Sequence, residues 1–259
     1  MIKTRVIPCL LLKESGLVKG VGFKNHTYVG DPINAVRIFN DKEVDEMIFL
    51  DIDATRIKQG PNFELIKDIA SEAFMPFAYG GGVTKIEHIE KLFKLGVEKV
   101  VLNTVCGSDL SFLSEASRIA GSQSIVGSID VKKSLFGKYK VFTNSGRTEL
   151  KESPIELALS LQNAGVGEIM VTSIDLEGTR KGMDLQLIEA ISKAVSVPVV
   201  ASGGVGDLDH FKQAALAGAS AVAAGSYFTF HGKHKAVLIT YPDYDELERL
   251  LNTESSNGR

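Results

Sequence analysis

The chain lacks most of the features that mark secreted, membrane-spanning or nucleic-acid-binding proteins. Its two cysteines, Cys9 and Cys106, lie in apolar runs and form neither a disulfide framework nor a metal-ligand spacing. The net charge of −3 gives no polyanion-binding signature, so we expect no nucleic-acid partner. No apolar segment approaches the length that crosses a bilayer. These absences predict a cytoplasmic protein without a membrane segment, a metal site or a cofactor.

The composition that remains is that of an ordinary globular protein. Hydrophobic residues make up 44% and charged residues 24% of the 259 positions. This length is common for an α/β barrel that folds as one domain. No composition shift marks a second domain.

One pattern occurs twice along the chain. The stretch Tyr79–Thr104 reads YGGGVTKIEHIEKLFKLGVEKVVLNT, and the stretch Ala201–Ser226 reads ASGGVGDLDHFKQAALAGASAVAAGS, 122 residues later. Each copy begins with an apolar run that ends at a pair of glycines. A segment with the residue periodicity of an α-helix follows, and then a second apolar run that ends at a pair of small polar residues. Each glycine pair alone is explained by a tight strand-to-helix turn. The matched pair favours two anion sites, because bare N–H groups at a loop or helix start bind phosphate.

Strand-like and helix-period segments alternate along the chain. We predict strands at Val6–Leu12, Met47–Asp51, Phe77–Tyr79, Val100–Asn103, Ser124–Asp130, Ile169–Thr172, Val199–Ser202 and Ala221–Gly225. We predict helices at Pro32–Phe39, Phe63–Phe74, Ile86–Leu95, Leu110–Ala120, Pro154–Asn163, Asp184–Ala194, Leu208–Ala217 and Tyr244–Leu251. The alternation predicts an α/β fold, a single (β/α)8 TIM barrel over 1–251 with an internal two-fold repeat of half-barrels, about 1–122 and 123–251. Residues 252–259 are expected to form a flexible tail.

Two connections are longer than a barrel needs. They run from Lys13 to Asp31 and from Lys132 to Pro154, with a small hairpin expected at 138–143. They follow barrel strands one and five, whose carboxyl ends lie on the catalytic face. We therefore expect these loops to act as lids.

Asp130 closes the fifth strand, where a carboxylate can act as general acid or base. The alternatives are a helix cap or a partner for Lys132. The internal repeat places position 11 at the matching end of the first strand, and that residue is leucine. Because leucine cannot exchange a proton, a mechanism that uses two opposed carboxylates is interrupted at Leu11.

A charged set occupies the strand starts: Arg5, Glu46, Lys99 and Glu168. From the residues alone, the simplest interpretation is a salt-bridged plug at the barrel base, because paired charges neutralise each other there. A charged ring around a narrow axial opening is the alternative.

Eight short motifs are spread along the chain: RVIPCL at 5–10, LVKG at 17–20, VGDP at 29–32, FLDIDA at 49–54, GGGV at 80–83, GSQSIV at 121–126, GEIMVTSID at 167–175 and VPVVASGG at 197–204. By these motifs nearly the whole chain, from Met1 to about Phe230, resembles the cyclase subunit of imidazole glycerol phosphate synthase, an enzyme of histidine biosynthesis.

The resemblance implies a barrel that binds a bisphosphorylated small molecule and docks a glutaminase subunit at its base, so that ammonia crosses the barrel axis. It implies Asp130 as one of two catalytic aspartates and Lys19 as the lysine of the mobile loop. The implied phosphate residues are Gly82, Asn103 and Thr104 at one end and Gly204, Gly225 and Ser226 at the other. The implied residues that line the site are Asp51, Thr172, Ser202 and Glu177, where the family more often has aspartate at the last position. The ring of Arg5, Glu46, Lys99 and Glu168 matches the family's ammonia gate, which replaces the plug interpretation.

The chain departs from the family pattern at Leu11, which stands where the family has the second catalytic aspartate, and at 237–242, which differ from the usual last helix. The chain thus resembles a second-copy paralogue of the kind linked to surface-polysaccharide pathways. Three functions stay open. The first is an ammonia-channelling amidotransferase subunit that supports sugar amidation through a third protein, a sugar amidotransferase. The second is a genuine cyclase in histidine biosynthesis. The third is a non-catalytic adaptor that activates the glutaminase.

Overall fold

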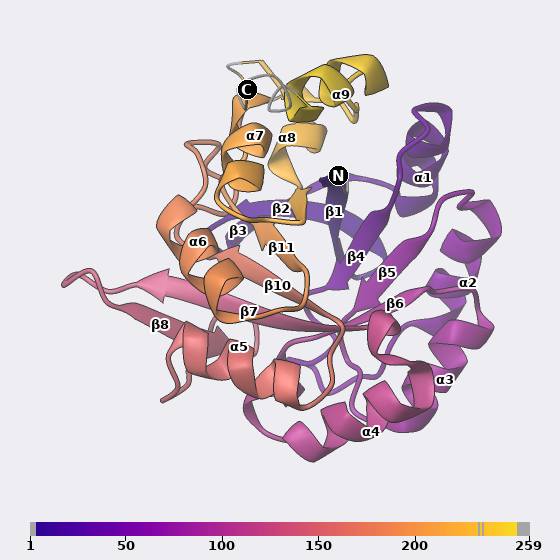
Figure 1. Ribbon diagram of the computed structural model, residues 1–259. Helices are drawn as coiled ribbons and strands as arrows, with labels where there is room; N and C mark the ends of the chain where they lie inside the picture. The colour runs from indigo at the N-terminus through magenta and orange to yellow at the C-terminus, as the bar shows by residue number, and fades with distance from the viewer. Residues whose placement is uncertain (1–3, 233, 235, 253–259) are drawn as a thin grey trace.

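The computed structural model describes residues 4–232, 234 and 236–252. Its centre is a closed barrel of eight parallel strands, in which each strand pairs with its neighbours and the last pairing, between β7 and β10, completes the circle (Figure 1). In barrel order the strands are β1 (Arg5–Lys13), β4 (Met47–Asp51), β5 (Phe77–Gly80), β6 (Lys99–Leu102), β7 (Ile125–Lys133), β10 (Glu168–Ser173), β11 (Val199–Ser202) and β12 (Ala221–Ala224). The predicted (β/α)8 barrel is confirmed.

Helices connect the strands and surround the barrel (Figure 1). They are α1 (Pro32–Asp41), α2 (Phe63–Glu72), α3 (Ile86–Lys94), α4 (Leu110–Ala120), α5 (Pro154–Asn163), α6 (Leu185–Ala194), α7 (Asp209–Leu216) and α9 (Tyr244–Asn252), with 3₁₀ turns η1 (Thr104–Gly107) and η2 (Ser122–Ser124). Local signals set their starts. Pro32 follows the N-cap Asp31, and Pro154 follows Ser153, which forms a capping box with Glu156.

Side-chain alternation along the strands separates two cores. On β1, Val6, Leu10 and Leu12 pack outward against the helices, whereas Ile7 and Cys9 point into the barrel. The interior layer is small and apolar, and it is completed by Ile48, Ala78, Val101, Val126, Met170, Val200, Ala221 and Ala223. The barrel axis is therefore lined by a narrow set of aliphatic side chains between its two charged ends.

Several element bounds differ from the prediction. The second helix ends at Glu72 and not at Phe74, because the Asn40 side chain donates to the Glu72 carbonyl and accepts from the Phe74 amide. The fifth strand begins at Ile125 after η2 and continues to Lys133. The predicted tail starts one residue too early, since Asn252 ends α9, and 253–259 lie outside the described residues.

The two long connections contain strands. The first is an antiparallel hairpin of β2 (Gly16–Val21) and β3 (Lys24–Gly30) that continues from β1. In the second, the hairpin expected at 138–143 is wrong in its pairing: β8 (Tyr139–Thr143) pairs with the end of β7 and with β9 (Thr148–Glu149). This β7–β8 hairpin projects away from the barrel (Figure 1), and Leu135 and Phe136 are fully exposed at its tip.

The chain after β12 was also not foreseen in full. It forms a short helix, α8 (Ser226–Thr229), and a small hairpin of β13 (Phe230–His231) and β14 (Ala236–Val237), before α9 packs against α7. Within the described part of the chain, no helix is long and apolar enough to cross a membrane.

Candidate functional site

A cavity of about 770 Å³ opens at the carboxyl ends of the barrel strands. Most of the candidate residues from the sequence meet there, although they come from the ends of all eight barrel strands and from the first long connection. Those that line it are Leu11, Lys19, Asp51, Gly82, Asn103, Thr104, Asp130, Thr172, Glu177, Ser202 and Gly225. The cavity is thus the place where the chain can bind a small molecule.

Asp130 lies at the wall of this cavity, in β7, and is 7% exposed. Its carboxylate accepts a hydrogen bond of 3.2 Å from the Asn103 amide. Burial, with a further contribution from the charge of Glu177, raises the pKa of Asp130 to about 7. A carboxyl group with such a pKa can both give and take a proton near neutral pH. Lys132 forms no ion pair with Asp130, because its ammonium donates to the Gly146 carbonyl and lies over the Phe142 ring, although its charge acts against the rise of the Asp130 pKa.

Leu11 lines the cavity from β1. In the barrel order β1 lies four strands from β7 in either direction, so Leu11 and Asp130 come from opposite walls. The side chain at this position has no atom that exchanges a proton. The cavity therefore has a titratable group on one wall and an aliphatic group on the facing wall.

Lys19 reaches the cavity from β2, and its ammonium group forms an ion pair with the Glu177 carboxylate. Both side chains are nearly buried, with 4% and 12% of their surface exposed. The Gly22 amide also donates to the Glu177 carbonyl at 2.9 Å. The β2–β3 hairpin is therefore attached to the loop after β10 by a buried ion pair and a backbone hydrogen bond.

The first predicted phosphate group of residues lies together in the cavity. Gly82 has a positive φ of 68°, and its amide donates to the Thr55 hydroxyl at 3.3 Å. Asn103 precedes η1, and Thr104 is the first residue of that turn. A side chain at Gly82 would meet the backbone of Gln59 and Gly60, so only glycine leaves this approach open.

The second predicted phosphate group is only partly in the cavity. Gly225 lines it, whereas Gly204 and Ser226 are not among the described residues that do. The Lys19 ammonium lies against Gly225, where a side chain would collide with it. The buried Ser226 hydroxyl has no hydrogen-bond partner among the described residues. The hairpin thus covers this end of the site.

Three further candidates line the cavity wall. Asp51 accepts backbone hydrogen bonds from Asp53 and Ala54 at 3.1 and 2.9 Å. Burial raises its pKa, against the effect of these two amides. Thr172 and Ser202 are paired across β10 and β11 and are both buried.

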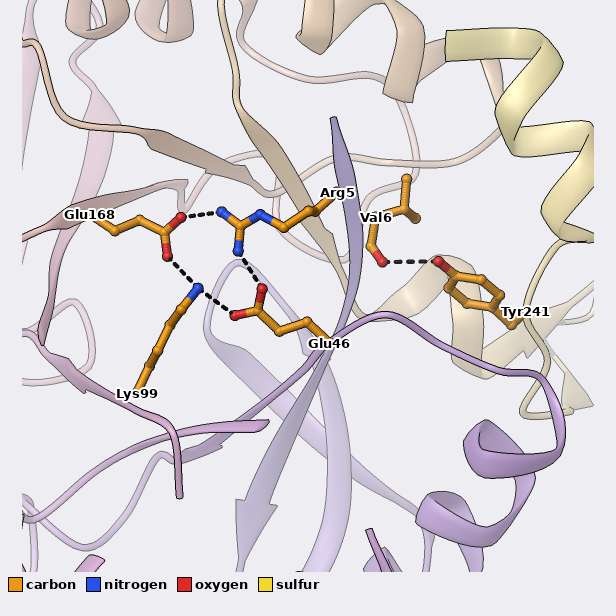
Figure 2. A network of polar contacts seen from close by, with 6 residues as sticks. All are labelled: Arg5, Val6, Glu46, Lys99, Glu168 and Tyr241. Carbon is orange, nitrogen blue, oxygen red and sulfur yellow. Dashed lines mark hydrogen bonds and ion pairs between the residues drawn. The ribbon is translucent and has the colours of Figure 1, made fainter. Parts of the chain in front are cut away.

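At the opposite end of the barrel, Arg5, Glu46, Lys99 and Glu168 form one closed ring of charges (Figure 2). The Arg5 guanidinium bonds both carboxylates, and the Lys99 ammonium bonds Glu46 at 2.9 Å and Glu168 at 3.1 Å. Burial acts to lower the pKa of Arg5. The negative charges of Glu168 and Glu46 outweigh burial, so that the pKa is raised. Every charge in the ring has two partners of opposite sign.

The sequence analysis missed several cavity residues that can contact an anionic ligand. Lys24 and His26 lie on β3, and Arg147 lies in the turn between β8 and β9. Burial, then Lys13, lowers the pKa of His26. In the sequence, only their position in the two long connections could have identified them as candidates. Among the described residues, no group of three or more His, Cys, Asp or Glu is arranged to hold a metal ion.

Comparison with known proteins connects this site to one family. The family model for histidine biosynthesis proteins matches residues 5–235. A Pseudomonas aeruginosa protein with the provisional name imidazole glycerol phosphate synthase subunit hisF2 is 55% identical over 252 residues, which cover 96% of this chain and 99% of that protein.

Two more distant relatives match over nearly their whole length and have related names. A Vibrio vulnificus protein, provisionally named subunit hisF3 of the same synthase, is 45% identical and covers 97% of both chains. A Leptospira interrogans protein, provisionally named its subunit HisF, is 40% identical over 97% of this chain and all of its own. The match to the family model and the identities to these HisF paralogues agree with the barrel and with the resemblance in the motifs. The chain therefore belongs to the histidine biosynthesis protein family, among the HisF-type paralogues.

Proposed function

We propose that this chain is the cyclase-type subunit of a glutamine amidotransferase complex, with a glutaminase docked at the barrel base. Ammonia passes along the barrel axis and is delivered for sugar amidation by a third protein. Cyclisation of the histidine-pathway substrate is slow or absent. The names of the relatives support the subunit part of this proposal, since each is named as a subunit of the synthase.

The observation that carries the proposal is Leu11 in the cavity wall opposite Asp130. Ring closure by ammonia requires protons to be taken up and released at different atoms of the substrate, and a single carboxyl group serves only one of them at a time. Losing a general acid or base typically lowers a rate by about 10²- to 10⁴-fold. A barrel that receives ammonia but cyclises poorly needs an acceptor elsewhere, which is the reason for a third protein.

The base of the barrel supports the ammonia path. The ring carries two positive and two negative groups, and small aliphatic side chains follow it along the axis. Ammonia is small and uncharged, so it gains no strong binding in such a lining and is not held there. The side chains of the ring leave the axis when their ion pairs exchange with those of a docked partner.

Steady-state assays with the bisphosphorylated substrate of the synthase and ammonium chloride test the proposal. The wild-type chain is expected to turn over at least about 10²-fold more slowly than a complete cyclase. Leu11→Asp should recover part of this loss, whereas Leu11→Asn, which is polar and of similar size but does not exchange a proton, should not. Turnover by the wild-type chain at the rate of a complete cyclase contradicts the proposal.

A genuine cyclase is the second candidate, and the carboxyl group of Asp51 favours it. This group is mostly buried, its pKa is raised, and it lines the same cavity as Asp130. It could take the role that Leu11 cannot. Growth without histidine of a cyclase-deficient strain that expresses the soluble chain would support this candidate, and loss of that growth on Asp51→Asn would assign the role.

A further inference from the structure

Tyr241 lies in the segment between β14 and α9, at the base of the barrel, and is 7% exposed. Its ring stacks on Phe228 of α8 with 5.2 Å between the ring centroids and an interplanar angle of 22°. Phe228 in turn contacts Phe39, Phe211 and Tyr227. The aromatic cluster therefore holds the Tyr241 ring in one place and directs its phenol.

The phenol of Tyr241 donates a hydrogen bond of 3.0 Å to the carbonyl of Val6 in β1 (Figure 2). Val6 pairs with Val222 of β12, but the ladder between β1 and β4 begins only at Cys9. Pro8 has no N–H to extend that ladder toward the base. Tyr241 thus supplies a donor at the part of β1 that β4 leaves unpaired.

The residue before Val6 is Arg5, the member of the charged ring that bonds both glutamates. Its amide donates to the Ser220 carbonyl at 3.3 Å. The start of β1 is therefore fixed on one side by Ser220 and on the other by Tyr241. Because side chains alternate, the same backbone that presents Val6 outward to the aromatic cluster directs Arg5 inward to the axis.

We propose that Tyr241 is a positioning residue for the charged ring. Its hydrogen bond to Val6 holds the start of β1 so that Arg5 stays between Glu46 and Glu168 and the ring stays closed. The inference deepens the proposed function, because the ring is the proposed entrance for ammonia. It also connects the C-terminal segment at 237–242, which departs from the family pattern, to that entrance.

The test uses the reactivity of Lys99, which the closed ring protects. Tyr241→Phe keeps the stacked ring and removes only the hydroxyl. The full-length chain is treated with limiting acetic anhydride, and acetylation of Lys99 is followed by mass spectrometry against Lys193, whose side chain is 75% exposed. Loss of one hydrogen bond corresponds to an expected rise of about 2- to 10-fold in the Lys99 rate, with Lys193 unchanged.

Tyr227→Phe is the matched control, because Tyr227 belongs to the same aromatic cluster, but among the described residues its phenol forms no hydrogen bond to β1. A rise at Lys99 in Tyr241→Phe and not in Tyr227→Phe supports the inference. If Tyr241 had only a structural role, Tyr241→Phe would have a lower melting temperature, but its rate of Lys99 acetylation relative to Lys193 would be unchanged. This result would overturn the inference. An equal rise in both variants would overturn it as well.

The outcome is separate from that of the proposed function. Lys99 reactivity is measured on this chain alone, with no glutaminase and no substrate. If Lys99 responds to Tyr241→Phe but glutamine-derived ammonia does not pass through the complex, the positioning role stands and the ammonia path falls.

Discussion

The ammonium group of Lys19 and the carboxylate of Glu177 form a buried ion pair, although 158 residues separate them in the chain. The pair joins the hairpin after the first barrel strand to the loop after the sixth. It also places a second carboxylate close enough to Asp130 to raise the pKa of that group. The state of the hairpin and the acidity of the cavity are therefore connected.

Glu177→Gln should release the β2–β3 hairpin. The substitution leaves the Lys19 charge without its counter-ion, which costs about 3–5 kcal/mol where both groups stay buried. The hairpin can instead move Lys19 into water, so we expect faster amide exchange confined to 16–30, with little change in the barrel strands. Hydrogen exchange followed by mass spectrometry measures this. In Glu149→Gln, which breaks a half-exposed pair with Lys140, exchange in the hairpin should stay at the wild-type rate. If the amides of residues 16–30 exchange at the same rate in Glu177→Gln and in wild type, the ion pair does not hold the hairpin.

Asp130 should make the protein less stable as the pH rises. Its pKa is raised in the folded state to about 7, so the folded chain keeps a proton that the unfolded chain has lost. Stability that is fully present below about pH 4 is therefore lost progressively up to about pH 7. Asp130→Asn removes this dependence, and the variant should be more stable than wild type at pH 8 by at most about 4 kcal/mol, because one pKa unit corresponds to about 1.4 kcal/mol.

Urea unfolding of wild type and variant between pH 4 and pH 8 measures this difference. Asp109 provides a control of opposite sign, because the Ser111 hydroxyl and the Phe112 amide lower its pKa. Asp109→Asn should lose stability at neutral pH and approach wild type as the pH falls. A constant gap between Asp130→Asn and wild type across the whole range would show that Asp130 titrates normally.

Glu46→Gln should destabilise the barrel base strongly. The glutamate is 8% exposed and bonds both Arg5 and Lys99, so its loss leaves two largely buried cations with one carboxylate between them. We expect a loss of about 3–5 kcal/mol in the free energy of unfolding. Glu72→Gln breaks a pair with Arg37 that is exposed to solvent, so its loss should change the stability far less than the loss of Glu46. Denaturant titration compares the two, and equal losses would contradict the assignment of the ring as a buried network.

Gly82→Ala should lower the stability of the protein much more than Gly137→Ala, in which the new methyl group causes backbone strain but no collision. Gly82 and Gly137 have positive φ values of 68° and 79°, but a side chain at Gly82 meets backbone atoms and one at Gly137 meets none. The strain costs about 1 kcal/mol at either position, and overpacking adds about 1–3 kcal/mol at Gly82. Thermal unfolding gives both values. Similar losses in the two variants would mean that the loop at Gly82 yields to a methyl group.

The alternation of strands and helices was predictable from the sequence because each barrel element carries its own local signal. Pro32 and Pro154 mark helix starts, and the buried strands are short aliphatic runs. The hairpin at 16–30 was missed because its glycines and lysines are typical of a loop. Its strands form because β2 pairs with the end of β1, from Leu11 to Lys13, and this long-range pairing leaves no local signal.

The candidate site was predictable only as far as strand ends converge in this fold. Asp130, Asn103 and Gly82 were placed correctly by that rule alone. The partners of long side chains were not, because they lie far away in the sequence. No local pattern shows that Lys19 bonds Glu177, or that the Tyr241 phenol reaches Val6 across 235 positions. Leu11, by contrast, could be recognised as unusual from the sequence, since the internal repeat is sufficient to mark it.

The charges at the barrel base sum to zero, and this balance would determine what could cross there. A neutral molecule would leave the cancellation intact as it passed, so its transit would demand no compensating ion. An ammonium ion would bring an unmatched fifth charge and would also have to shed its hydration shell in a low-dielectric neck. The charge balance of the ring would then be sufficient to favour the passage of ammonia over the ammonium ion, without a further side chain that distinguishes the two.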